Sequence, residues 1–125
     1  MFSTPGHHET AVTFYDPYDG LLLTGDTVYP GRLYVNDWPA FVDTIDRLVD
    51  ISRERPVVHL LGCHIEMTTT PGIDYPVQAN YQPDEVPLQM TVAQLRDIRA
   101  AVDRIGENLT GRQVFDDFVI CVDTD

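Results

Sequence analysis

The first runs of strand-forming residues in the chain are short and lie close together, at residues 11–15 and 21–24. Both runs are rich in β-branched, aromatic and aliphatic side chains, which favour strands. The segment between them reads Asp-Pro-Tyr-Asp-Gly (residues 16–20), and its Asp-Gly step favours a tight turn with a positive φ angle. Residues 11–24 are therefore predicted to form a β-hairpin.

Two longer stretches show the spacing of amphipathic helices. The first starts after Asp37, a residue suited to an N-cap, and the second after Thr91, which fits a capping box with Gln94. Gly106 suits the C-terminal cap of the second helix. In both stretches the other face is rich in charged and polar residues, so each helix is expected to bury one side. The apolar stripes are Trp38, Phe41, Val42, Ile45, Leu48 and Val49 in the first helix, and Leu95, Ile98, Val102 and Ile105 in the second.

The remaining segments complete an α/β pattern. Residues 57–61 form an apolar run without alternation, which is typical of a strand covered on both faces. Residues 66–87 hold four prolines and no periodicity, so they are predicted to be a long loop, and residues 114–122 a last strand. The order hairpin, helix, strand, loop, helix, strand predicts one α/β domain over residues 1–125, with a sheet of about four strands covered by helices on one face.

Composition and charge narrow the function classes. The chain has 20 acidic against 8 basic residues, a formal net charge of −12, and 43% hydrophobic residues, as in a folded globular protein. The acid excess would repel phosphate backbones and anionic lipids, so we expect no nucleic-acid or membrane partner and consider metal cations the better candidates. Residues 1–8 show no secretion signal, and the two cysteines, Cys63 and Cys121, have no CxxC spacing. A cytoplasmic location is expected.

Potential metal ligands occur in three short segments at strand ends or in neighbouring loops. These are Thr-Pro-Gly-His-His-Glu (residues 4–9), Thr-Gly-Asp-Thr (residues 24–27) and Gly-Cys-His-Ile-Glu (residues 62–66). Imidazole nitrogens and carboxylate oxygens bind zinc, iron and manganese, and the glycines allow the backbone to turn the ligands toward one point. A histidine in a glycine-flanked turn is more often a surface residue, so each segment alone is weak. Together they favour a metal site.

These segments also carry a family resemblance. Residues 4–7 resemble the third metal motif of the metallo-β-lactamase-fold hydrolases, and Leu-Leu-Leu-Thr-Gly-Asp (residues 21–26) resembles the fourth. His64, just past a predicted strand, is similar to the final histidine ligand of that family. The resemblance spans about residues 2–120 and implies the C-terminal half of a four-layer αββα sandwich, with a mixed, mostly antiparallel sheet. It also implies that His7 binds a first metal, that Asp26 bridges two metals at the catalytic centre, and that His64 binds the second. The metals would be zinc, with iron or manganese as alternatives.

The chain departs from the family in one respect. The leading HxHxDH motif is absent, and neither His8 nor His59 replaces it. Two protein ligands for each metal fall short of the three or four that a tight zinc site uses. We therefore expect a truncated reading frame that lacks the N-terminal half, in which residues 2–3 are the tail of a strand. Its uncovered sheet face should form a homodimer or bind a complementing N-terminal half.

Two functions follow from the resemblance and the departure. The first is a metal-dependent hydrolase in which a metal-bound hydroxide attacks an ester, thioester, amide or phosphoester of a small molecule, although this chain alone would not be catalytically complete. The alternative is a non-catalytic, degenerate half-domain that dimerises or acts as a scaffold. Simple metal buffering by acidic loops is a third possibility.

Four residues near these motifs allow two interpretations each. Arg32 either binds an anionic substrate group or, more commonly for such a residue, lies at the surface. Cys63 is expected to be a packed residue rather than a ligand or nucleophile. Glu9 and Glu66 either orient a histidine ligand or belong to the solvated acidic surface, which is the more common outcome.

Overall fold

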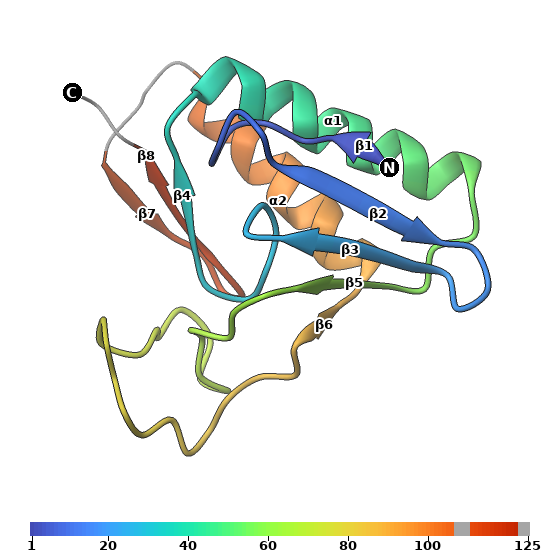
Figure 1. Cartoon of the computed structure of the whole chain (residues 1–125). Helices are drawn as coiled ribbons and strands as arrows, with labels where there is room; N and C mark the ends of the chain where they lie inside the picture. Colours follow the sequence, from blue (N-terminus) through green and yellow to red (C-terminus); the bar gives the residue numbers. More distant parts are fainter. Residues whose placement is uncertain (107–110, 123–125) are drawn as a thin grey trace.

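A computed structural model describes residues 1–106 and 111–122, and over these ranges it contains two helices and eight strands (Figure 1). The helices are α1 (Trp38–Glu54) and α2 (Val92–Ile105). The strands are β1 (Phe2–Ser3), β2 (Val12–Asp16), β3 (Leu21–Gly25), β4 (Arg32–Val35), β5 (His59–Gly62), β6 (Gln89–Met90), β7 (Arg112–Val114) and β8 (Val119–Val122).

The strands form two mixed sheets. One has the order β1-β2-β3-β5-β6, in which β3 and β5 are parallel and the other pairs antiparallel. The other has the order β4-β8-β7, with β4 and β8 parallel. Figure 1 shows the two helices side by side along the sheets, and one hydrophobic core unites residues from both helices and both sheets. The predicted α/β fold class is confirmed.

The predicted hairpin forms for local reasons. The Asp16 carboxylate accepts a hydrogen bond from the Tyr18 amide at 2.9 Å, and the Gly20 amide donates to the Asp16 carbonyl at 2.9 Å. Gly20 has a φ of 67°, a conformation that costs glycine little. The expected strand at residues 2–3 is also present, as β1 paired with β2.

Both helices begin where the sequence predicts. Asp37 caps α1 by accepting from the Ala40 amide at 3.1 Å. Thr91 and Gln94 form the reciprocal capping box of α2, with distances of 3.1 and 2.8 Å, and Gly106 closes this helix with a φ of 54°. The buried residues of α1 are Phe41, Thr44, Ile45, Leu48, Val49 and Ile51, and those of α2 are Leu95, Ile98, Ala101, Val102 and Ile105. Within the part of the chain that the structure describes, neither helix is long and apolar enough to cross a membrane.

The larger sheet buries only one of its faces. Leu22 and Leu60, which pair across β3 and β5, are fully buried, whereas Phe14 and Leu23 on the opposite face are 49% and 39% exposed. The prediction that the strand at residues 57–61 is covered on both faces is therefore wrong. The helices pack on one side of the sheet only, so alternate residues of β5 remain partly exposed. We call the apolar part of this exposed face the open sheet face; it comprises Val12, Phe14, Leu21, Leu23 and Leu61.

The C-terminal segment differs most from expectation. The single strand predicted at residues 114–122 is two strands, β7 and β8, because the chain reverses between them: the Phe115 amide donates to the Phe118 carbonyl at 2.9 Å and their rings stack at 5.0 Å. The unpredicted strand β4 pairs with β8, so this segment belongs to a second sheet rather than to a single four-stranded one.

Candidate functional site

Asp26 and His64 meet at one edge of the larger sheet. Asp26 follows β3 and His64 follows β5, and because these strands are parallel neighbours, their carboxyl ends lie together. The Asp26 Oδ1 atom is 2.9 Å from the His64 Nε2 atom. Both side chains are about half exposed, at 49% and 53%. The pair is thus accessible from solvent and preassembled.

A tight turn after β3 presents Asp26. The Thr24 hydroxyl donates to the Val28 carbonyl at 2.6 Å, and the Thr27 amide donates to the Thr24 carbonyl at 3.0 Å. Gly25, with a φ of 54°, supplies the left-handed conformation that the turn requires. Thr24, Thr27 and Val28 are buried, so the turn is anchored on both sides of the exposed carboxylate.

Close backbone packing positions His64. The Cys63 amide donates to the Gly25 carbonyl at 3.0 Å, which ties the end of β5 to the turn. Gly62 lies against Tyr29 so closely that an added Cβ atom would be 2.5 Å from the Tyr29 Cβ atom. The edge of the Tyr29 ring meets the His64 imidazole, with 5.2 Å between ring centroids. Cys63, expected to be packed, is exposed at this edge.

The Tyr29 phenol stays neutral beside the Glu66 and Asp26 carboxylates. Burial, followed by the neighbouring Glu66 and Asp26 carboxylates, raises the pKa of Tyr29 far above its ordinary value. Its hydroxyl donates a short hydrogen bond to the Arg32 carbonyl. Tyr29 therefore acts as a fixed wall for His64 rather than as an ionisable group.

His7 lies on a loop that is fastened to the start of α1. The Asn36 and Asp37 amides donate to the Gly6 carbonyl at 2.8 and 2.9 Å. The His7 Nδ1 atom is 2.9 Å from the Tyr34 carbonyl oxygen, and since a carbonyl only accepts, Nδ1 carries the hydrogen. In the neutral ring this leaves the lone pair on Nε2, the arrangement of a metal-binding histidine with a backbone partner.

The adjacent His8 has the opposite arrangement. Its Nδ1 atom accepts from the Thr10 amide at 3.1 Å, so in the neutral ring the hydrogen is on Nε2. Of the two neighbouring histidines, His7 presents a free Nε2 lone pair and His8 does not. This supports the assignment of His7, rather than His8, as a candidate ligand.

The three candidate ligands are only partly brought together. Asp26 is in direct contact with His64, and His7 and Asp26 line a common cavity of about 360 Å³. Within residues 1–106 and 111–122, however, no group of three or more His, Cys, Asp or Glu side chains could hold a metal ion. His59 lies at the opposite end of β5 from His64.

The Asp26–His64 pair fits two positions of a metal site. Ligands about 2.1 Å from zinc at angles between 90° and the tetrahedral value are about 3.0 to 3.4 Å apart. The observed 2.9 Å between Oδ1 and Nε2 is close to this range. The described residues therefore supply an aspartate and histidine pair of suitable spacing, together with a nearby histidine in the correct tautomer, but not a complete ligand set.

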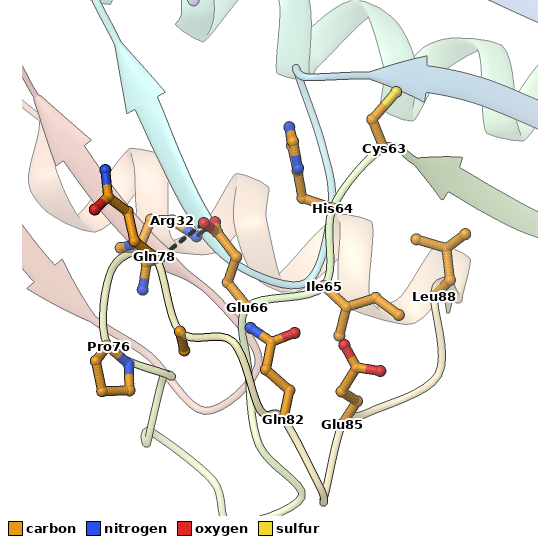
Figure 2. A pocket seen from close by; sticks show the side chains of 11 residues that line it. Arg32, Cys63, His64, Ile65, Glu66, Pro76, Gln78, Gln82, Glu85 and Leu88 are labelled. Atoms are coloured by element: carbon orange, nitrogen blue, oxygen red, sulfur yellow. Dashed lines mark hydrogen bonds and ion pairs between the residues drawn. The ribbon is translucent and has the colours of Figure 1, made fainter.

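Arg32 is buried in an ion-pair network and does not lie at the surface. It is 5% exposed, so the surface interpretation is wrong. Its guanidinium pairs with Glu66 at 2.7 Å (Figure 2) and also with Asp74 at 2.9 Å. Asp74 in turn pairs with Arg112 at 2.8 Å. Burial works against the charged form of Arg32, but the hydrogen bond with Asp74 and the charge of Glu66 raise its pKa above the ordinary value. Burial likewise works against the charged form of Asp74, but the hydrogen bonds from Arg112 and Arg32 lower its pKa.

This ion-pair network fastens the start of the long loop that follows His64. Glu66 is held by Arg32, since its second oxygen also accepts from the Arg32 amide at 2.9 Å. The network links residues more than 30 positions apart, so no local pattern in the sequence indicates it. A cavity of about 450 Å³ opens between this loop and His64 (Figure 2).

Comparison with known proteins supplies one match. The family model of the metallo-beta-lactamase superfamily matches residues 1–101, a range that includes all three candidate ligands. No curated protein and no solved structure matches the chain. The family match thus covers four fifths of the sequence.

Proposed function

The chain belongs to the metallo-beta-lactamase superfamily, and on that premise we propose that it works as a metal-dependent hydrolase with Asp26, His64 and His7 as metal ligands. The observation that carries the proposal is the contact of 2.9 Å between Asp26 Oδ1 and His64 Nε2 at the carboxyl edge of two parallel strands. This is the edge at which open α/β sheets commonly bind their ligands.

The geometry supports the proposed roles. Asp26 has one oxygen on His64, and its exposed carboxylate has a second oxygen with which to bridge two ions. His64 is steadied by the Tyr29 ring, and His7 by its bond to the Tyr34 carbonyl. The proposed metal is zinc, with iron or manganese as alternatives. The chemistry that such an ion supplies is a hydroxide near neutral pH, because coordination lowers the pKa of water to about 7.

The proposed substrate is a small molecule with an ester, thioester, amide or phosphoester bond. A working site also needs ligands beyond these three residues, since a catalytic zinc ion usually has three protein ligands of its own. We propose that they come from a complementing segment or from a second copy of the chain.

Zinc titration of the 125-residue chain tests the assignment. We expect zinc binding that each of His7→Ala, Asp26→Ala and His64→Ala weakens by about tenfold or more, because each removes a direct ligand. His8→Ala is the matched control, since it deletes an adjacent histidine whose Nε2 lacks a free lone pair. Binding that none of the three changes weakens, or that His8→Ala weakens equally, would contradict the proposal.

The open sheet face favours a second candidate function, a non-catalytic module that associates with a second copy of itself. Its apolar residues continue across three strands, with Phe14 opposite Leu23 and Leu23 opposite Leu61. The same register places Asp16 and His59 beside Leu21 at the turn end of the sheet, outside this apolar area. Two copies can therefore meet over the apolar area despite the net charge of −12.

Sedimentation measurements separate this candidate from the first. Self-association through the open sheet face predicts dimers that Phe14→Glu abolishes. Tyr18→Glu is the control, because Tyr18 is 97% exposed in the hairpin turn, away from that face. A chain that stays monomeric at high concentration, or dimers unaffected by Phe14→Glu, would exclude association by this face.

A further inference from the structure

We propose that the cavity beside His64 binds the positively charged amino group of a small molecule and discriminates against carboxylates and phosphates. If the hydrolase function proposed above is correct, this cavity selects amine-bearing substrates. The binding preference itself can be tested without metal or catalysis.

The cavity has the size and position of a substrate pocket. Its volume is about 450 Å³, within the usual range of about 300 to 1,000 Å³ for small-molecule sites. Figure 2 shows the segment from His64 to Glu66 on one side of the cavity and the long loop on the other, with Glu85 extending toward Ile65. The residues from this loop that line it are Pro76, Gln78, Ala79, Gln82, Glu85 and Leu88.

The arginine in the cavity wall is not available to an anionic ligand. Nη2 of Arg32 donates to Glu66 at 2.7 Å, and Nη1 donates to Asp74 at 2.9 Å and to the Tyr75 carbonyl at 2.6 Å. Nε donates to the Tyr34 hydroxyl at 3.2 Å. An anion would have to break these buried bonds and would meet two carboxylates already paired with the guanidinium. The positive charge of Arg32 is therefore neutralised within the wall.

The remaining polar groups of the wall suit a cation. Glu85 is exposed, and among the described residues its carboxylate forms no hydrogen bond or ion pair, while its backbone is held by a bridge to Thr68. Gln78 and Gln82 add amide oxygens that accept hydrogen bonds from an ammonium group. A cation gains from the charge of Glu85, and an anion is repelled by it.

The apolar part of the wall indicates what joins the amino group to the rest of the ligand. Ile65, Pro76 and Leu88 contribute hydrocarbon surface to the wall, and Ile65 lies between Glu85 and His64 (Figure 2). A short alkyl or aromatic linker would bury against them. The ligand class is therefore a small amine with an apolar linker.

Three probes that differ in terminal charge test this inference. N-acetyl-1,5-diaminopentane, N-pentylacetamide and 6-acetamidohexanoate carry a positive, a neutral and a negative end on similar chains. We would titrate each into the ¹⁵N-labelled, metal-free full chain and follow the amide signals of residues 63–66 and 76–88. The cationic probe should bind about threefold more tightly than the neutral probe, and the neutral probe about threefold more tightly than the anionic one. Threefold is the change in affinity for two unit charges about 6 Å apart in water.

Two variants locate the charge responsible. Glu85→Gln keeps the shape of the side chain and should remove about threefold of the preference for the cation. Glu54→Gln removes the same charge from the exposed end of α1 and should leave the preference unchanged.

Equal or tighter binding of the anion overturns the proposal, as does the absence of shifts at the cavity with all three probes. Loss of the preference in both variants would assign it to the net charge of the chain and would overturn the proposal as well. A chain that fails the zinc titration and still prefers the cation would refute the hydrolase function alone.

Discussion

Gly62→Ala is the substitution that tests most directly how the fold builds the Asp26–His64 pair. An alanine Cβ at this position would be 2.4 Å from the Val28 carbonyl oxygen and 2.5 Å from the Tyr29 Cβ atom. Contacts this short essentially never occur, and the atoms involved belong to backbone or to its immediate branch, so no side chain can rotate away. The end of β5 must move.

The size of the effect follows from these distances. A comfortable contact for a methyl group is about 3.5 Å, so the strand end has to shift by about 1 Å. Overpacking of this kind costs about 1 to 3 kcal/mol, and rigid neighbours place Gly62→Ala near the upper end. The same shift would lengthen the contact of 2.9 Å between Asp26 and His64 beyond hydrogen-bond range. We therefore expect the stability and the zinc affinity to fall together.

Urea unfolding followed by circular dichroism, paired with zinc titration, measures both consequences. Gly111→Ala is the matched control, because a Cβ atom there meets nothing within 4 Å among the described residues. It should leave stability unchanged or raise it by up to about 1 kcal/mol. If Gly62→Ala unfolds within about 0.5 kcal/mol of the unsubstituted chain and binds zinc normally, the steric reasoning is refuted.

Three further predictions concern the fold and the ion-pair network. Leu60→Ala should lower the free energy of unfolding in urea by about 2 to 5 kcal/mol, because Leu60 is fully buried. Leu23→Ala should lower it by less than about 1 kcal/mol, because Leu23 lies on the open sheet face. Equal losses would show that both faces are covered. Thr91→Ala should cost about 1 kcal/mol by loss of the capping box, with Thr10→Ala, outside any helix, as the comparison. Burial works against the ionised form of Asp74, but the hydrogen bonds from Arg112 and Arg32 lower its pKa below the value in the unfolded chain. The Asp74 carboxylate therefore stabilises the fold above about pH 4, and this contribution is lost as the pH falls further. Asp74→Asn should therefore be less stable at pH 7, and the difference should shrink in unfolding measurements taken toward pH 2; a constant difference would contradict the ion-pair explanation.

The elements predicted correctly are those whose signals are local. The turn at residues 16–20 is specified by an aspartate that caps its own turn and by a glycine four positions later. The start of α2 is specified by Thr91 and Gln94, three positions apart. In such cases the hydrogen-bond partners are neighbours in sequence, so the pattern alone predicts the structure.

The elements that were missed or misjudged depend on partners far along the chain. Strand β4 follows a Pro-Gly pair and contains Arg32, and its register is set by pairing with β8, almost ninety residues later. The burial of Arg32 likewise depends on Asp74, 42 positions away. The turn between Phe115 and Phe118 interrupts an otherwise strand-like run, because stacking of the two rings compensates for the reversal. Composition and periodicity do not predict contacts between residues that are so far apart in sequence.

The two adjacent histidines show why the candidate site was only partly predictable. By residue type, His7 and His8 are equivalent ligands, and only the resemblance to a family motif favours His7. The structure separates them by the partner of Nδ1: a carbonyl 27 positions away fixes the hydrogen of His7 on Nδ1, whereas an amide two positions away makes Nδ1 of His8 an acceptor. His64 is a third case, since its Nε2 atom is in contact with the Asp26 carboxylate at 2.9 Å. If the proposed site binds a metal, His7 would offer its Nε2 lone pair without rearrangement, whereas His64 would have to move its hydrogen from Nε2 to Nδ1. The contact between the Tyr29 and His64 rings would allow this change, because it involves no bond to a ring nitrogen.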